Sequence, residues 1–396
     1  MVYTFSNMLI KDKKIAIAGG GPGGLTLARL LQMNGADVTV YERDQNKDVR
    51  VQGGSLDLHD ESGLAALRKA GLLDAFKANY RVGADKMRLV DNQAHILYDE
   101  HKEKSVKDFG DEHFRPEIDR GPLRDILLAS LEPGTVVWNK HILSLEPVGN
   151  SWKINFHNGD STIADIVIGA DGANSKVRPF VTSIKPFYVG ITAIEGTVYD
   201  PEKTAPGINE LLEGGKIFAF GNEKSLFVSS KGDGTLGFFP GWKTSESWVR
   251  ESCPDLMDRG QMLAWFKKEF AEWGDIWHQL FKSDTTNFVV RPQYCMPLDQ
   301  TWDAHSNITL LGDAAHWMPP YAGEGVNMAM LDALELSECL TNSAFPDVQA
   351  AIAGYEKQML ARFAEVGKTT MQQTESLHSP HALSDMMIMF GQAERQ

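Results

Sequence analysis

The chain has 396 residues, of which 42% are hydrophobic and 23% are charged, and its formal net charge at neutral pH is −14. A chain of this length is too long for one average domain and can bury a large core, so two domains are expected. The acidic balance argues against non-specific binding to nucleic acid or to an anionic membrane, because both attract basic surfaces.

The cysteines and the N-terminal residues point to a cytoplasmic protein without a metal or a disulfide. Cys253, Cys295 and Cys339 lie far apart and form no C-x-x-C pair, so we expect reduced, buried thiols. Residues 1–12 lack the long apolar core of a secretion signal, and no apolar stretch is long enough to cross a bilayer. We expect a monomer that binds small molecules and neither nucleic acid nor membrane.

The first predicted elements form a strand, a glycine turn, a helix and a second strand that ends in an acid. In chain order they are Lys14–Ala18, Gly19–Gly24, a helix near Gly23–Asn34, and Val38–Tyr41 followed by Glu42. A glycine turn between a strand and a helix, with an acid at this distance, is typical of an adenine-dinucleotide site.

Each part of this unit has a physical role in that interpretation. Gly19 permits the tight turn, Gly21 lets the backbone approach a pyrophosphate, and Gly24 lets the helix pack closely on the strand. The pyrophosphate would lie at the helix N-terminus, where free N–H groups favour an anion. Glu42 would accept hydrogen bonds from the adenosine ribose, which favours an unphosphorylated ribose. The motif alone leaves FAD and NAD both open.

Farther along, the predicted elements alternate between two kinds of sheet. A helix starts near Asp119, and mostly apolar strands at Ala164–Ala170 and Asn307–Leu311 suit a parallel sheet. Between about 184 and 288, short runs such as Lys216–Phe220 and Ser225–Val228 indicate antiparallel hairpins. The aromatic residues of this segment suit one sheet face that lines a pocket: Phe218, Phe220, Phe227, Phe238, Phe239, Trp242 and Trp248. A second domain is therefore inserted into the first, and a crevice is expected between them.

Three separated motifs resemble those of the FAD-dependent, single-component aromatic hydroxylases, known as class A. They are the glycine turn, the block Ile168–Arg178 built around Asp171-Gly172, and Gly312–His316. Within that family the chain looks most similar to the tetracycline-inactivating flavin monooxygenases, through Tyr41–Asp44, Gly53–His59 and Gly312–Asn327. The similarity covers the nucleotide domain well and the inserted domain poorly.

The resemblance implies an α/β fold of the para-hydroxybenzoate hydroxylase type. A Rossmann-like FAD-binding domain would comprise residues 1–75, 106–182 and 288–341. An inserted α+β substrate domain would comprise residues 76–105 and 183–287, and a C-terminal helix at 342–396 would bridge them. The apolar residues of that C-terminal region include Met371, Leu377 and Met386, and we expect them to pack across both domains, with a lid or a partner site as the alternative.

The resemblance also implies the cofactor-binding residues. Glu42 would bind the adenosine ribose, Arg43 would lie along the flavin, Asp57 and Arg120 would hold the flavin and its linker, and Asp313 would bind the ribitol. The backbone N–H groups near Gly323 would bond the pyrimidine edge. The complete set is Gly19, Gly21, Gly24, Glu42, Arg43, Asp57, Arg120, Asp313, Pro320, Gly323, Gly325, Val326 and Asn327.

Two further residues of these motifs are assigned by the resemblance. Arg50 matches an arginine implicated in the encounter with NADPH, although a solvated surface charge is the alternative for both Arg43 and Arg50. His316 has the position of a structural histidine beside the flavin loop, which we prefer to a catalytic base.

The implied reaction is an NAD(P)H- and O2-dependent hydroxylation of an electron-rich enol, phenol or ring through a flavin C4a-hydroperoxide. Because the cofactor supplies that chemistry, no catalytic side chain is assigned. The sequence contains one dinucleotide-binding motif, although the implied reaction uses two dinucleotides, FAD and NADPH. NADPH would therefore be a transient co-substrate without a Rossmann domain of its own. A flavin reductase or dehydrogenase of the same fold, or a non-enzymatic FAD sensor, remains open.

Substrate identity is open at three positions where the tetracycline enzymes use Gln, Arg and His. Here these positions are Thr192, Lys216 and Gly237. An apolar and aromatic wall is kept at Phe218, Phe227, Pro320, Tyr321 and Gly323. A tetracycline-type antibiotic is the leading candidate, which would make the protein a resistance enzyme. The alternative is a hydroxylase of another aromatic metabolite.

Overall fold

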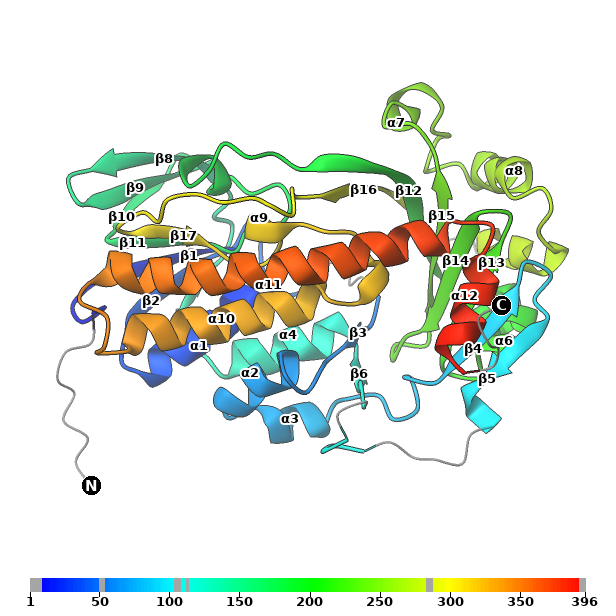
Figure 1. The fold of residues 1–396 in the computed structure, drawn as a ribbon, viewed down its shortest axis with the longest axis horizontal. Coiled ribbons are helices and arrows are strands. Elements are labelled where there is room, and N and C mark those ends of the chain that lie inside the picture. The colour runs from blue at the N-terminus through cyan, green and yellow to red at the C-terminus, as the bar shows by residue number, and fades with distance from the viewer. Residues whose placement is uncertain (1–8, 50–53, 103–107, 112–113, 283–287, 392–396) are drawn as a thin grey trace.

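The structure is a computed structural model that describes residues 9–49, 54–102, 108–111, 114–282 and 288–391. Two sheets dominate it, and a long C-terminal helix runs from one sheet to the other (Figure 1). The predicted α/β class is confirmed, but residues 288–295, which were assigned to the FAD-binding domain, form a strand of the second sheet. Within the described residues, no helix combines the length and apolarity that crossing a membrane requires.

A five-stranded parallel sheet forms the first half, in the order β17-β11-β1-β2-β7. Its strands are β1 (Lys14–Ala18), β2 (Asp37–Tyr41), β7 (Val136–Val137), β11 (Ile166–Gly169) and β17 (Ile308–Leu310). Ile17 is aligned with Val40 on one side and with Ile168 on the other. All residues of β11 and β17 are buried, as expected for strands covered on both faces.

The predicted strand Ala164–Ala170 was too long. Ala164 ends β10, which belongs to a separate antiparallel sheet formed by β8 (Ile142–Val148), β9 (Ser151–Phe156) and β10 (Ser161–Ala164). Asp165 separates the two strands, and its carboxylate accepts a hydrogen bond of 2.8 Å from the N–H of Lys14. A short polar residue at a strand edge therefore divided a run that looked continuous in its apolar pattern.

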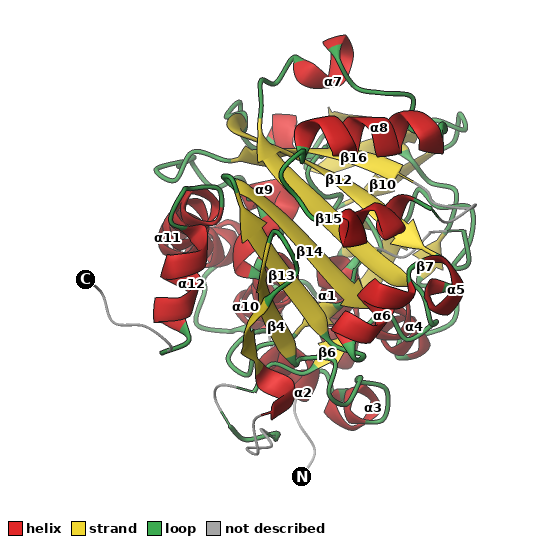
Figure 2. Ribbon diagram, turned by 90° about the vertical axis from the view of Figure 1, so that its right-hand side faces the viewer, coloured by secondary structure: helices red, strands yellow, loops and turns green. Residues whose placement is uncertain are grey.

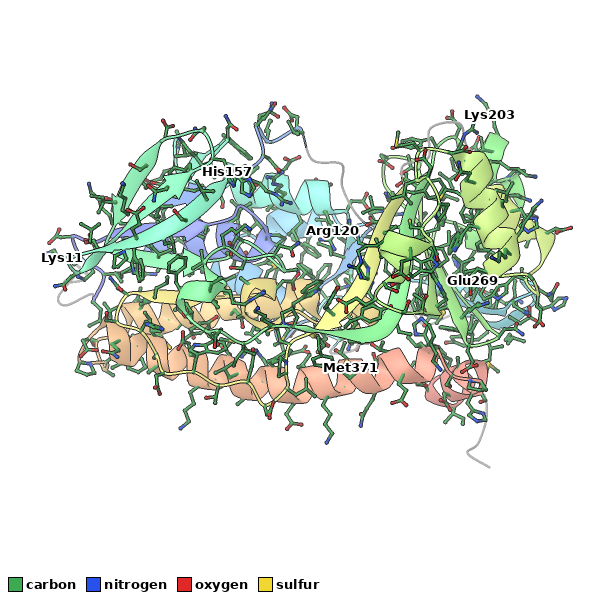
Figure 3. The ribbon with its side chains drawn as sticks, turned by 90° about the horizontal axis from the view of Figure 1, so that it is seen from above. Lys11, Arg120, His157, Lys203, Glu269 and Met371 are labelled. Carbon is green, nitrogen blue, oxygen red and sulfur yellow. The ribbon has the colours of Figure 1, made fainter. Side chains whose placement is uncertain are left out.

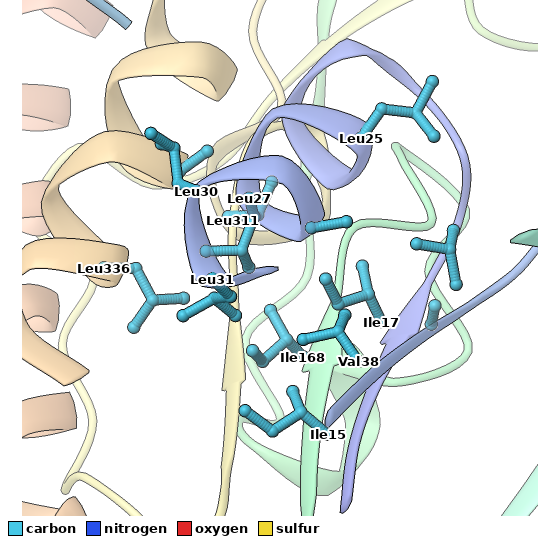
Figure 4. Packing of buried hydrophobic residues seen from close by; sticks show 14 of the residues in the cluster. Ile15, Ile17, Leu25, Leu27, Leu30, Leu31, Val38, Ile168, Leu311 and Leu336 are labelled. Carbon is cyan, nitrogen blue, oxygen red and sulfur yellow. The ribbon is translucent and has the colours of Figure 1, made fainter. Parts of the chain in front are cut away.

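The antiparallel sheet of β8, β9 and β10 lies on one face of the parallel sheet, and helices cover the other face (Figure 1). These helices are α1 (Pro22–Met33), α2 (Gly63–Lys69), α3 (Leu73–Lys77), α4 (Arg120–Ala129) and α10 (Gly325–Thr341). Helix α1 buries Leu27 and Leu31 against the sheet, and Leu336 of α10 belongs to the same cluster (Figure 4). Burial of apolar side chains of this size contributes about 1.5–3 kcal/mol each.

The second sheet has seven strands in the order β16-β12-β15-β14-β13-β4-β5, and Figure 2 shows most of them side by side. They are β4 (Met87–Asp91), β5 (Ile96–Asp99), β12 (Phe187–Val198), β13 (Lys216–Gly221), β14 (Lys224–Ser230), β15 (Leu236–Lys243) and β16 (Phe288–Cys295). The predicted hairpin of β13 and β14 is confirmed, with Phe218 opposite Phe227.

One face of the second sheet is covered by short helices. These are α5 (Pro201–Thr204), α6 (Pro206–Leu212), α7 (Trp248–Glu251), α8 (Arg259–Glu269) and the 3-10 helix η3 (Asp275–Phe281). Ile217, Trp242 and Phe266 belong to the core between these helices and the sheet. The other face of the sheet is turned toward the half of the molecule that contains the five-stranded parallel sheet, which is called the nucleotide half below (Figure 1).

The C-terminal region consists of two helices, where the sequence indicated one. Helix α11 (Val348–Leu377) passes along the parallel sheet, and α12 (Ala382–Met389) then packs against the second sheet beside β4 and β13 (Figure 1). Cys295 and Cys339 are buried free thiols, whereas Cys253 is only half-buried. Within the described part of the chain, no group of three or more metal-ligating side chains is found.

Candidate active site

The glycine turn after β1 has the geometry that its three glycines require. Gly19 has a φ of +105°, and a Cβ on it would lie 2.4 Å from the carbonyl oxygen of Ala170. A Cβ on Gly24 would lie 2.2 Å from the carbonyl oxygen of Gly19, which is closer than any real contact. Gly21 differs, because a Cβ there would meet nothing within 4 Å. The turn is therefore tight at its ends and open at its centre.

The open centre of the turn is also the start of helix α1. Gly21 is the N-cap residue, no side chain caps the helix, and the first turn contains no acidic residue. The N–H groups of this helix end and the positive end of its dipole remain available for an anion. The site fits a pyrophosphate.

Glu42, the acid after β2, lies beside this turn. Its side chain is buried and accepts hydrogen bonds from the N–H groups of Gly20 at 2.7 Å and Asp44 at 3.0 Å. Arg43, the next residue, is exposed. Arg50 lies outside the described residues. Glu42 is thus fixed at the carboxyl end of a central strand, where nucleotides bind in open α/β sheets.

The Asp-Gly motif and the Gly-Asp motif are bonded to each other. The carboxylate of Asp171 accepts a hydrogen bond of 2.6 Å from the N–H of Lys176. That turn places Arg178, whose guanidinium donates to the carbonyl oxygens of Asp313 at 2.7 Å and Ala314 at 2.6 Å. The middle motif therefore braces the short helix α9 (Asp313–His316).

A buried ionic network fixes the other side of the Gly-Asp motif. Asp332 of α10 is fully buried and accepts hydrogen bonds from the N–H of Gly312 at 2.8 Å, His316 Nε2 at 2.6 Å and Arg362 at 2.6 Å. Burial raises the pKa of Asp332, but the His316 and Arg362 partners outweigh it and hold the pKa below its usual value. The Nε2 of His316 is thus bonded to Asp332 and its ring stacks on Phe363, and these contacts agree with the predicted structural role of His316.

Asp313 itself presents a carboxylate in buried surroundings. Burial raises its pKa, although His316, Arg120 and Arg178 act in the opposite direction. Among the described residues, its carboxylate oxygens make no hydrogen bond. A carboxylate in this state suits a ligand that is rich in hydroxyl groups, because buried polar groups are costly without a partner.

Asp57 and Asn327 tie a second loop to the start of α10. Asp57 belongs to the small sheet of β3 (Leu56–Asp57) and β6 (Glu117–Ile118). The side chain of Asn327 is fully buried, accepts from the N–H of His59 at 2.9 Å and donates to the carbonyl oxygen of Asp57 at 2.9 Å. Asn327 therefore acts through its side chain as a structural clamp, which leaves its backbone for the predicted cofactor contact.

Arg120 lies close to this loop, at the N-terminus of α4. Its Nε donates to the carbonyl oxygen of Gly54 at 3.3 Å. Figure 3 labels Arg120 where the nucleotide half meets the second sheet. The loop that follows α9 contains the 3-10 helix η4 (Pro320–Ala322), and Gly323 after it has a φ of +72°.

The face of the second sheet that is turned toward this loop consists of rows of side chains from neighbouring strands. Directly paired residues share a face, so the pairings define the rows. One row is polar and contains Lys216, Ser229, Gly237 and Thr197. The next row, two residues along each strand, is aromatic and contains Phe218, Phe227 and Phe239. Tyr321 of η4 contacts Phe227 and Phe239, with ring centroids 5.9 and 6.4 Å apart.

The predicted aromatic set is thus divided between the two faces of the sheet. Phe218, Phe227 and Phe239 lie in the aromatic row, whereas Phe238 and Trp242 belong to the core on the opposite face. The alternation of side chains along a strand explains the division. The structure brings Phe218, Phe227 and Tyr321 together, and their contact with a substrate stays a prediction.

Thr192 does not belong to this wall. It pairs directly with Trp242 and therefore shares the opposite face of the sheet. The residue is fully buried, and its hydroxyl is 2.9 Å from that of Tyr188. The prediction that Thr192 contacts substrate is corrected, because an alignment of hairpins does not reveal the face on which a residue lies.

Lys216 is on the expected face but is already paired. Its ammonium forms an ion pair with Glu117, which is almost fully buried. Burial lowers the pKa of Lys216, but the carboxylates of Glu117 and Asp57 more than compensate and hold the pKa above its ordinary value. Glu117 could not be predicted as this partner, because it belongs to a two-residue strand that lies outside the three motifs.

Comparisons with known proteins agree with this geometry. The FAD binding domain family matches residues 12–363. The monooxygenase asqM of Emericella nidulans is 31% identical over 83% of this chain and 83% of its own length. The 3-amino-4-hydroxybenzoate 2-monooxygenase PtmB3 of Streptomyces platensis is 28% identical over 93% of this chain and 89% of its own. The crystal structure of tetracycline destructase Tet(55) covers 96% of this chain and 95% of its own, with a TM-score of 0.74 and 21% identity, which shows the shared fold alone.

Proposed function

Because the chain belongs to the FAD binding domain family and is an FAD-dependent monooxygenase, we propose that it hydroxylates a flat aromatic or enolic small molecule with NADPH as a transient reductant. The observation that carries this proposal is the placement of η4. Its Tyr321 contacts the aromatic row of the second sheet, and a Cβ on Gly323 at its end would lie 3.2 Å from the Asp57 carboxylate.

We assign the cofactor as follows. The end of α1 at Gly21 would hold the pyrophosphate of FAD, Glu42 the adenosine ribose, and the unpartnered carboxylate of Asp313 the ribitol. Asp57, Arg120 and the first N–H groups of α10, at Gly325 and Val326, would hold the flavin end. When bound, FAD supplies the redox chemistry that connects NADPH, O2 and the substrate.

The chain's own residues would orient the substrate and exclude water. Phe218, Phe227 and Phe239 offer a wall for a planar ring, and Phe218 and Phe227 meet edge to face with centroids 4.9 Å apart. The C-terminal helix α12 closes one end of this wall through Met386. An apolar enclosure of this kind protects reactive oxygen chemistry from water.

We favour an aromatic metabolite other than tetracycline as the substrate. Of the three positions at which the tetracycline enzymes use polar side chains, Thr192 lies on the opposite face and Lys216 is paired with Glu117. Gly237 offers no side chain. The tetracycline hypothesis is retained as the second candidate, because Phe218, Phe227 and Tyr321 keep the apolar wall that it requires.

The proposal is tested with purified, FAD-loaded protein. NADPH oxidation, oxygen uptake and hydrogen peroxide are measured with a panel of phenols, quinolones and tetracycline, and products are examined by mass spectrometry. We expect at least one phenol or quinolone to accelerate oxygen uptake and gain the mass of one oxygen atom, while the absorbance spectrum of tetracycline stays unchanged. Oxidation of NADPH that yields only hydrogen peroxide with every compound would contradict the proposal.

A further inference from the structure

We propose that Lys231 binds an oxygen-bearing, preferably anionic, edge of the substrate, in the place that the sequence comparison assigned to Gly237 and Lys216. This inference rests on the proposed function for the location of the substrate. The inference adds to the proposed function a residue that determines specificity and the chemical class of the substrate. That class is a planar aromatic compound with a carboxylate, enolate or carbonyl oxygen on one edge.

The side chain of Lys231 folds back over Gly237. A Cβ built on Gly237 would lie 3.1 Å from Lys231 Cε and 3.8 Å from its Nζ. The ammonium donates a long hydrogen bond of 3.4 Å to the hydroxyl of Thr197, the next residue in the same row. The absence of a side chain at Gly237 thus makes room for a lysine from the adjoining turn.

The turn that carries Lys231 is fixed in place. The N–H of Lys231 donates to the carbonyl oxygen of Thr235 at 2.9 Å, and the N–H of Gly232 donates to the carboxylate of Asp119 at 2.6 Å. Asp119 belongs to the nucleotide half, so the turn bridges the two halves beside the site. A cation held on an anchored turn needs little reordering when it binds a ligand.

The neighbouring charges are already neutralised by partners. Lys216 is paired with Glu117. Arg81 lies 3.5 Å from Asp119 and donates to Ser230, and Arg291 is 2.7 Å from Glu195. Among the residues that the structure describes, Lys231 has no carboxylate within ion-pair distance. Lys231 is therefore a cation beside the polar row that no carboxylate of the described residues engages.

The acid nearest to Lys231 in sequence has other partners. The carboxylate of Asp233 accepts hydrogen bonds from the N–H and the hydroxyl of Thr235, at 3.0 and 2.7 Å. Its pKa is lowered because these two bonds and the nearby Lys231 ammonium outweigh burial. Asp233 thus lies close enough to be influenced by Lys231 without forming a pair with it.

The row spacing sets the size of the ligand. The aromatic row lies two residues along each strand from the polar row, a separation of about 7 Å at the rise of a β-strand. A bicyclic or larger ring system on Phe227 and Phe239 would extend its edge to the polar row. An ammonium there favours an oxyanion through a charge-assisted hydrogen bond.

The test uses two planar probes with the same ring system, 3-hydroxy-2-naphthoate, which carries an anionic carboxylate, and 3-hydroxy-2-naphthamide, which carries a neutral carboxamide of similar size. Binding to the FAD-loaded protein is measured by isothermal titration calorimetry, without NADPH, so no turnover is needed. We expect the naphthoate to bind better than the naphthamide. Lys231→Met should weaken naphthoate binding about tenfold and change naphthamide binding by less than about twofold, as expected for one charge-assisted hydrogen bond.

Two further variants separate this role from general effects on the fold. Lys231→Arg should retain the preference for the anion, because it keeps the positive charge. Lys243→Met removes an exposed lysine of β15 that is paired with Glu223, and it should leave both affinities unchanged.

The outcomes separate the inference from the proposed function. Equal loss of both probes in Lys231→Met, unchanged naphthoate binding in that variant, or no saturable naphthoate binding to the unaltered protein would each overturn the role of Lys231. If the probes bind as expected but no aromatic compound is oxygenated, the proposed function fails while the assignment of Lys231 stands.

Discussion

The nucleotide half and the second sheet of this protein are specified in different ways. In the nucleotide half, Gly19 and Gly24 occupy positions where a Cβ would lie 2.4 and 2.2 Å from backbone carbonyl oxygens. In the second sheet, Gly237 occupies a position where Lys231 from a nearby turn takes the available space. Local backbone geometry determines the first region, and contacts between strands determine the second.

This difference explains why motifs carry over well to one region and poorly to the other. A backbone clash leaves one acceptable residue at a position, so the sequence pattern identifies the structure. A row of paired side chains tolerates substitutions, because a charge that is lost at one position can be supplied by a residue at a neighbouring position. The combined polarity and charge of the row, and not the residue at each single position, then determine which ligand it can bind.

The largest effect is expected for Asp332→Ala in the nucleotide half. The substitution leaves His316 and Arg362 without their buried partner and removes the acceptor of the Gly312 N–H. Breaking a buried ion pair costs about 3–5 kcal/mol, so the urea midpoint should fall strongly. Ser337→Ala, on the same helix, provides a matched control with a hydroxyl that bonds only its own helix. A comparable decrease of the urea midpoint in both variants would show that the network around Asp332 contributes no more to stability than an ordinary helix hydrogen bond.

The second prediction compares two glycines of one turn. Gly24→Ala should lower the free energy of unfolding by about 1–3 kcal/mol, because the new Cβ must displace helix α1 from Gly19. Gly21→Ala should cost less than about 1 kcal/mol, since its Cβ meets nothing, yet weaken FAD binding about tenfold through lost backbone contacts. Chemical denaturation and FAD fluorescence titration separate the two effects. Equal FAD affinity in Gly21→Ala and the unaltered protein would contradict the pyrophosphate assignment.

What could be predicted from the sequence follows the same division. The parallel strands, the β13–β14 hairpin and the family were predictable, because apolar periodicity and glycine spacing are local signals. The face of Thr192 and the pairing of Lys216 with Glu117 were not predictable, because both depend on register between strands that are distant in sequence. The assignment of Lys231 needed the position of a turn relative to Gly237.

The third prediction concerns the C-terminal end of α11, which joins the nucleotide half to the second sheet. His378 is fully buried, its Nδ1 is 2.8 Å from the carbonyl oxygen of Thr374, and its Nε2 is 3.0 Å from the Ser225 hydroxyl. Burial lowers the pKa of His378 from 6.5 to about 4. The unfolded chain therefore binds this proton below about pH 6.5, whereas the folded chain resists it down to about pH 4.

The stability that neutral His378 contributes is therefore fully present above the pKa that His378 has in the unfolded chain. It is lost as the pH falls toward the pKa that His378 has in the folded chain. Between about pH 7 and about pH 5 the free energy of unfolding should fall by about 2 kcal/mol from this group. His378→Gln should flatten that part of the pH profile in urea titrations. An unchanged slope in the variant would show that other groups dominate the profile.

The smallest effect on substrate affinity is expected for Thr192→Val, and its matched partner is Thr197→Val. Both residues lie on β12, but Thr192 shares the face of Trp242, whereas Thr197 shares the face of Gly237 and bonds Lys231. Thr192→Val should therefore cost about 1 kcal/mol of stability through its lost bond to Tyr188 and leave the KM of any substrate unchanged. Thr197→Val should change KM severalfold with little effect on stability, because it removes the hydroxyl that accepts a hydrogen bond from the Lys231 ammonium. If Thr192→Val were the variant that changed KM, the strand pairing would not predict which face of the second sheet contacts the substrate. The proposed contrast between the nucleotide half and the second sheet would then be wrong.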